Sequence, residues 1–123
     1  LLKSITMQKK NKLIAEFMGL TNHYNDNSIM LRETPEGNVV VHVYDLDYDS
    51  SWHWLMPVVE KIEYIESITH GNQFQVIIRE EEVGIYDKHT QTHIVYIPAD
   101  GESKLTNTHK AVVEFIKEYN QNN

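Results

Sequence analysis

The chain has 123 residues, of which 41% are hydrophobic, and this length and composition predict a single domain with one core. Its formal net charge is −7, from 18 acidic and 11 basic residues, which disfavours binding to nucleic acid because phosphate contacts need a basic face. It contains no cysteine, so disulfides, thiolate metal sites and cysteine nucleophiles are excluded.

The two ends of the chain carry weak signals for ordered structure. The first residues lack helical periodicity and the last four are polar, so we expect residues 1–8 and 120–123 to be flexible. The residues before Met7 are consistent with an upstream extension of a chain whose natural start is Met7. No apolar run approaches membrane-spanning length and no signal peptide is apparent, which predicts a cytoplasmic protein with no membrane partner.

The first third of the chain predicts a helix followed by a β-hairpin. Apolar residues between positions 13 and 18 form a one-sided stripe and Gly19 favours a helix end, so we expect a helix at residues 8–18. Residues 21–27 are polar and predict a connector. Two apolar segments flank the turn sequence TPEG and predict a hairpin of strands at residues 28–33 and 38–46.

The segment DLDYDSSWHWLMPVVEKIE, at residues 45–63, predicts an amphipathic helix that contains a proline. Trp52 shares a helical face with Leu55, so we expect Trp52 in the core and Trp54, which is rotated off this face, nearer the surface. Pro57 either bends a helix that spans residues 51–66 or lies in the first turn of a shorter one.

The rest of the chain predicts three strands and a final helix. A strand at residues 74–80 precedes a hairpin around DKHTQ, where Gly84 suggests a bulge or a close backbone approach. The last helix is expected to begin near Ser103, a good N-cap. The order α-β-β-α-β-β-β-α, with short connections between strands, predicts an α+β fold with one mainly antiparallel sheet and helices packed on one face.

Three alternating acids, Asp45, Asp47 and Asp49, have the spacing that begins an EF-hand calcium loop. The later ligands of that loop are missing, because position six is Ser50 rather than glycine and position twelve is Met56 rather than glutamate. We therefore expect Asp45 and Asp47 to be solvated and Asp49 or Ser50 to cap the next helix. The sequence predicts no metal site and no other cofactor.

The histidines and serines do not form a recognisable catalytic pattern. His89 and His93 are four residues apart, but in a hairpin this spacing does not place both imidazoles on one helical face. We expect His42 and His53 to be partly exposed polar residues. No GxSxG elbow surrounds the serines that precede Trp52, and no glycine loop suits a phosphate, so no catalytic residue is assigned.

The aromatic segment before Pro57 is the best candidate for a functional surface. Tyr48, Trp54 and Met56 have the composition of a protein–protein anchor, since large side chains bury much area at a small entropy cost. The alternative is that Trp54 packs beneath the polar connector at residues 21–27.

Two segments of the chain resemble a known family. SSWHWLMPVVEKIE, at residues 50–63, and KAVVEFIKEYN, at residues 110–120, resemble small uncharacterised proteins of Bacteroidetes-type bacteria and of their phages and prophages. NKLIAEFMGL, at residues 11–20, fits the opening of that family, whose pattern has an aspartate in place of His53. The resemblance implies a compact cytosolic accessory protein associated with mobile elements, and it implies no activity, cofactor or catalytic residue.

These observations predict a non-enzymatic binding or accessory protein that acts through contacts with another protein at the aromatic segment, rimmed by acidic residues. The alternative is a small metal- or metabolite-binding domain or enzyme that uses His42, His53 or the three alternating aspartates. Homo-oligomerisation through the apolar strands at residues 39–44 or 74–78 is compatible with either hypothesis.

Overall fold

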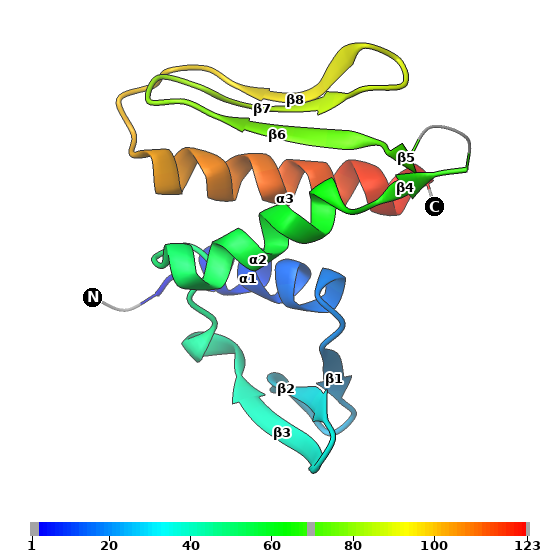
Figure 1. The fold of residues 1–123 in the computed structure, drawn as a ribbon. Helices are drawn as coiled ribbons and strands as arrows, with labels where there is room; N and C mark the ends of the chain where they lie inside the picture. The colour runs from blue at the N-terminus through cyan, green and yellow to red at the C-terminus, as the bar shows by residue number, and fades with distance from the viewer. Residues whose placement is uncertain (1–2, 69–70, 123) are drawn as a thin grey trace.

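Three helices lie between two small antiparallel sheets in the computed structural model, which describes residues 3–68 and 71–122 (Figure 1). The helices are α1 (Ile5–Phe17), α2 (Trp52–Glu63) and α3 (Lys104–Asn122). One sheet contains β1 (Thr21–His23), β2 (Asp26–Thr34) and β3 (Gly37–His42), and the other contains β6 (Phe74–Ile78), β7 (Val83–Asp87) and β8 (Thr92–Ile97). A 3-10 turn, η1 (Val43–Asp45), follows β3, and β4 (Glu66–Ser67) pairs with β5 (Gly71–Asn72).

The predicted α+β class and the antiparallel pairing are confirmed, but the strands do not form one sheet. In Figure 1 the sheet of β6, β7 and β8 lies on one side of the helices and the sheet of β1, β2 and β3 lies on the other. The helix α2 separates the two hairpins along the chain, so each hairpin pairs only with strands next to it in sequence. The result is a layer of helices with a sheet on each side.

The first helix begins earlier than the apolar stripe predicted. It starts at Ile5 rather than near residue 8, because the Ser4 hydroxyl accepts a hydrogen bond from the Met7 N–H at 3.0 Å and caps the first turn. Its end is as predicted, with Gly19 at a φ of +95° directly after the last helical turn. The prediction of a plain connector at residues 21–27 is wrong, because β1 pairs with β2 there despite its polar sequence.

The second helix continues through its proline. Residues on both sides of Pro57 are helical, which agrees with the hypothesis of one longer helix and rules out a helix that starts at the proline. The prediction that Trp52 is a core residue is wrong, since its side chain is 37% exposed. Trp52 is the first residue of the helix, and the buried face starts one turn later with Leu55.

The second sheet and the last helix match the predictions closely. Both strands of the second hairpin form, and Gly84 permits a close approach, since a Cβ there would lie 2.9 Å from the His93 ring. The register shift occurs instead between Ile85 and Tyr86. The third helix packs its buried face against β7 and β8, with the Phe115 ring edge-on to that of Phe74 at 4.9 Å.

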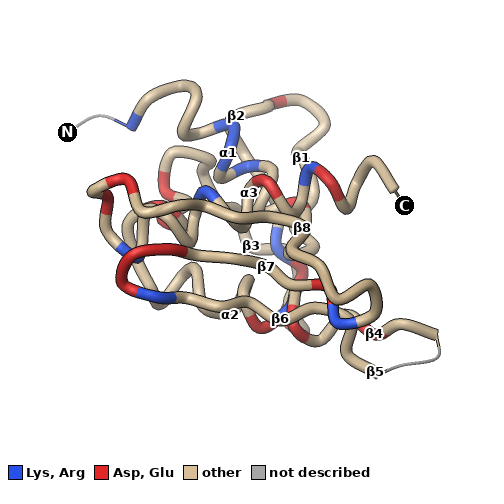
Figure 2. The backbone as a smooth tube through the Cα atoms, turned by 90° about the horizontal axis from the view of Figure 1, so that it is seen from above, with Lys and Arg blue, Asp and Glu red and all other residues tan. Residues whose placement is uncertain are grey.

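Acidic and basic residues are interleaved along the chain in Figure 2, with an acidic run at residues 80–82 in the turn between β6 and β7. Arg79 pairs with Glu82 at this turn at 3.1 Å, and Lys110 pairs with Asp100 at 3.0 Å. Such partly exposed pairs contribute little to stability. Over residues 3–68 and 71–122, no helix is both long and apolar enough to cross a membrane.

Two of the serine N-caps, Ser51 and Ser103, provide a matched test of local stability. The Ser103 hydroxyl accepts a hydrogen bond from the Thr106 N–H at 3.0 Å, whereas Ser51, at the start of α2, makes no such side-chain bond. We expect Ser103→Ala to lower the free energy of unfolding by about 1 kcal/mol. Ser51→Ala should change it by less than about 0.5 kcal/mol. Urea denaturation of both variants measures the difference, and equal losses would contradict the assignment of the caps.

Candidate functional site

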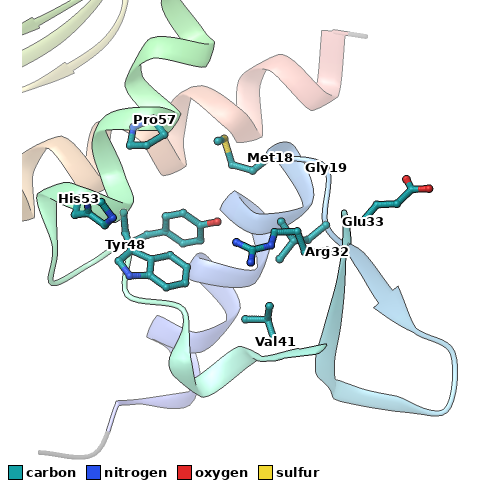
Figure 3. A pocket seen from close by; sticks show the side chains of 10 residues that line it. Met18, Gly19, Arg32, Glu33, Val41, Tyr48, His53 and Pro57 are labelled. Carbon is teal, nitrogen blue, oxygen red and sulfur yellow. The ribbon is translucent and has the colours of Figure 1, made fainter. Parts of the chain in front are cut away.

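A groove of about 450 Å³ lies between the N-terminal half of α2 and the sheet that contains β2 and β3. Its walls come from three separate parts of the chain, namely the residues directly after α1, the β2–β3 hairpin, and the first half of α2 with the segment that leads into it (Figure 3). We call it the α2–β3 groove. The residues that line it are Met18, Gly19, Leu20, Arg32, Glu33, Val41, Tyr48, His53, Trp54 and Pro57.

Two of the predicted anchor residues form the aromatic wall of this groove. Tyr48 is 5% exposed, and its ring lies edge-on to the Trp54 ring, with centroids 5.2 Å apart and an interplanar angle of 89°. Edge-on contacts of this kind stabilise an aromatic pair beyond its burial alone. Met56 is exposed and lies outside the groove lining. The structure therefore groups Tyr48 with Trp54 and places Met56 apart from them, and the role of all three as partner anchors stays a prediction.

The opposite wall follows from the alternation of side chains along a strand. Met30 is fully buried, and Arg32, two residues later on the same face of β2, lines the groove. On β3, Val41 lies opposite Met30 and Val39 lies opposite Arg32. One face of the hairpin therefore packs on the core at one end and lines the groove further out.

Two polar groups in the groove have no partner within the described part of the chain. The Arg32 guanidinium makes no hydrogen bond or ion pair there, and neither does the Tyr48 hydroxyl. Figure 3 shows these two groups pointing toward one another across the groove. Burial raises the pKa of the Tyr48 hydroxyl, and the nearby Arg32 charge opposes this shift only in part. Tyr48 is therefore a neutral hydrogen-bond donor at physiological pH.

The first half of α2 contains a backbone carbonyl that lacks its usual helical donor. Pro57 has no N–H, so it cannot donate to the carbonyl of His53 four residues earlier, and both residues line the groove. The His53 side chain is exposed. His42 is exposed at the end of β3 and is not part of the lining, so the two histidines considered for catalysis do not share a site.

The three alternating aspartates do not gather into one cluster. Asp45 is exposed, whereas Asp47 accepts a hydrogen bond from the Lys3 Nζ at 3.1 Å. The Asp49 Oδ1 lies 3.5 Å from the same Lys3 nitrogen. The prediction that Asp49 or Ser50 caps α2 is wrong, because the N-cap position is one residue later and Asp49 is bound elsewhere. No metal-binding group of three or more His, Cys, Asp or Glu side chains is found within residues 3–68 and 71–122.

A buried polar network that the sequence patterns did not reveal lies behind the groove. Asn11 is fully buried in α1, and its Nδ2 donates to the Leu46 carbonyl at 2.9 Å and to the Asp49 Oδ1 at 2.7 Å. Its Oδ1 accepts a hydrogen bond from the His109 Nε2 at 2.9 Å. Lys3 donates to the Leu46 carbonyl as well, at 2.6 Å. The one local signal is that Asn11 occupies an apolar helical position, three residues before Ile14.

This network fixes the segment that carries Tyr48. Leu46 and Asp49 flank that residue, and Asn11 binds both of them from α1. His109 then ties the same asparagine to α3. The His109 ring is only 3% exposed, so it positions other residues and is closed to a substrate. The network therefore holds the aromatic wall of the groove in place.

Comparisons of the chain with protein-family models, with curated proteins and with solved structures found no match. The resemblance of residues 50–63 and 110–120 to a family of Bacteroidetes-type bacteria and their phages therefore stays a prediction. Both segments are largely helical, in α2 and α3, and both bury an apolar face in the core.

The buried histidine predicts a pH dependence of stability. Burial lowers the pKa of His109 from 6.5 to about 4, and the nearby Asp49 carboxylate opposes the shift. In the unfolded chain His109 binds a proton below about 6.5, whereas in the folded protein it remains neutral until about pH 4. The stabilisation that the neutral, buried His109 provides is therefore complete above about pH 6.5. It is lost as the pH falls from about 6.5 to about 4. The loss predicted from the shift is about 3 kcal/mol.

His109→Gln tests this assignment, because glutamine keeps an N–H donor for Asn11 but does not titrate. Urea denaturation of both proteins between pH 7.5 and pH 4 gives the free energy of unfolding as a function of pH. We expect the decrease toward acid to be smaller in the variant than in the wild type. Parallel curves for the two proteins would contradict the role of His109, since other titrating groups are common to both.

Proposed function

We propose that this protein is a non-enzymatic binding protein that takes up a segment of a partner protein in the α2–β3 groove. The observation that carries the proposal is the aromatic and aliphatic lining of this groove, with Trp54 partly buried and edge-on to Tyr48. Hot spots of protein interfaces are typically aromatic side chains in pockets that exclude water. The groove is also large enough to hold one or two side chains of a partner.

The contacts of the polar residues favour a peptide-binding protein over an enzyme or a metal site. The alternative of a metal- or metabolite-binding site or an enzyme requires histidines or aspartates that converge. Asp47 and Asp49 are instead bound by Lys3 and Asn11, and the same two residues also donate to the Leu46 carbonyl of this segment. The groove itself presents hydrogen-bonding groups on an apolar surface, as a recognition site does.

The carbonyl that is left without a donor from Pro57 suits an extended peptide. The His53 carbonyl lacks a helical donor from Pro57 and can accept an N–H from a partner chain. Peptide recognition commonly combines such main-chain bonds, which give affinity, with side-chain pockets that give specificity. A cytoplasmic accessory protein associated with a mobile element, as the resemblance implies, would use a site of this kind on a host or phage protein.

The two tryptophans of α2 provide the first test. Tagged wild-type protein, Trp54→Ala and Trp52→Ala are used to capture partners from a lysate of the source organism, with identification by mass spectrometry. We expect Trp54→Ala to lose the captured partner, because it removes part of the groove wall, and Trp52→Ala to retain it, because Trp52 lies outside the groove. Loss of the partner with Trp52→Ala alone would contradict the proposal.

A second pair of variants shows whether a blocked groove, and not a loss of stability, abolishes capture of the partner. Val41 faces the groove, whereas its neighbour Val40, which is 54% exposed, faces the opposite side of the hairpin. Val41→Trp should fill the groove and abolish capture, and Val40→Trp should leave capture unchanged. Circular dichroism and thermal unfolding establish whether both variants are folded. Capture that survives Val41→Trp would place the interaction elsewhere on the molecule.

A further inference from the structure

Arg32 is an exposed cation at the edge of a largely apolar groove, and it has no hydrogen-bond or ion-pair partner within the described residues. Glu33 is the acidic residue of the lining, and it follows Arg32 on β2, so the two side chains leave the strand on opposite faces. Figure 3 shows the Glu33 carboxylate directed away from the groove and the Arg32 guanidinium directed into it. In a chain with a net charge of −7, acidic groups are abundant, yet none within the described residues pairs with this guanidinium.

The groups around Arg32 complete a site for an anion. The Tyr48 hydroxyl points toward the guanidinium from the other wall and is also without a hydrogen-bond partner in the described residues. Trp54 and Pro57 provide apolar surface in the same groove as these two groups. A ligand that satisfies both donors would therefore sit between the sheet and the aromatic wall.

We infer that Arg32 and Tyr48 bind a carboxylate of the partner segment, and that an adjacent apolar side chain of that segment packs against Trp54 and Pro57. This inference rests on the function proposed above and names the chemistry of the partner. The planar guanidinium matches a carboxylate in a bidentate arrangement, which gives both strength and orientation. The Tyr48 hydroxyl donates a further hydrogen bond to the same group.

A carboxylate fits this site better than a phosphate. One guanidinium balances one negative charge, whereas a phosphate group carries nearly two and is usually held by several cations or by a row of backbone N–H groups. The acidic chain disfavours the approach of the more highly charged group. The carboxylate has two sources in a peptide, an acidic side chain or the C-terminus, and both present the same two oxygens.

The test uses three sets of short fluorescein-labelled peptides, each with leucine, phenylalanine or tyrosine beside the varied position. The first set carries Asp and an amidated C-terminus, the second carries Asn and an amidated C-terminus, and the third carries Asn and a free C-terminal carboxylate. Fluorescence anisotropy with the full chain measures the affinity. We expect the first or the third set to bind at least about tenfold more tightly than the second, which also identifies the source of the carboxylate.

Variants then assign this preference to the two donors. Arg32→Gln should remove the tenfold preference for the acidic peptides, and Tyr48→Phe should reduce it. Arg79→Gln is the control, since Arg79 is an exposed arginine in the turn between β6 and β7, outside the groove. An equal loss with Arg79→Gln would indicate general charge attraction and overturn the inference.

The outcomes distinguish this inference from the proposed function. If amidated Asn peptides bind as tightly as acidic ones, and Val41→Trp abolishes all binding, the carboxylate site is refuted and the groove remains a peptide site. If no peptide of any set binds, or if Val41→Trp and Val40→Trp bind alike, the groove is not a peptide site and both proposals are overturned.

Discussion

The buried amide of Asn11 is the constraint on which the rest of this structure depends. A primary amide placed in a core must satisfy its donors and its acceptor, because each unpaired group costs free energy comparable to a lost hydrogen bond. Asn11 does this with three partners from two other parts of the chain, the segment before α2 and the helix α3. Satisfying one side chain therefore sets the relative positions of α1, α3 and the strand-to-helix connection.

The groove is a consequence of this arrangement together with the division of the strands into two sheets. The connection held by Asn11 places Tyr48 against Trp54 and builds one wall. The β2–β3 hairpin is anchored to the helices through Met30, but its face extends beyond the core, and this free part builds the other wall. Because the strands form separate sheets, this hairpin pairs with no strand of the β6–β8 sheet.

Local patterns in the sequence predicted the elements well and their three-dimensional partners poorly. Alternation and turn residues located both hairpins, and the cap at Ser103 located α3. Trp52 was assigned to the core incorrectly because the helical face was extended to this residue, where the helix only begins. The hydrogen bond between Asn11 and His109 joins residues 98 positions apart, so the periodic pattern of apolar residues within one helix or strand does not reveal it. For the same reason, Arg32 was not recognised as part of a site.

Successive positions on one strand face serve two separate purposes in this fold. Met30 belongs to the core, whereas Arg32 and Val39, one pleat further out, contact the groove or the solvent. Substitutions at the outer pleat change the surface offered to a ligand at little cost in folding free energy. Under the proposed function, recognition and folding are encoded by different residues of the same strand, so selection could alter the groove surface while the architecture is maintained.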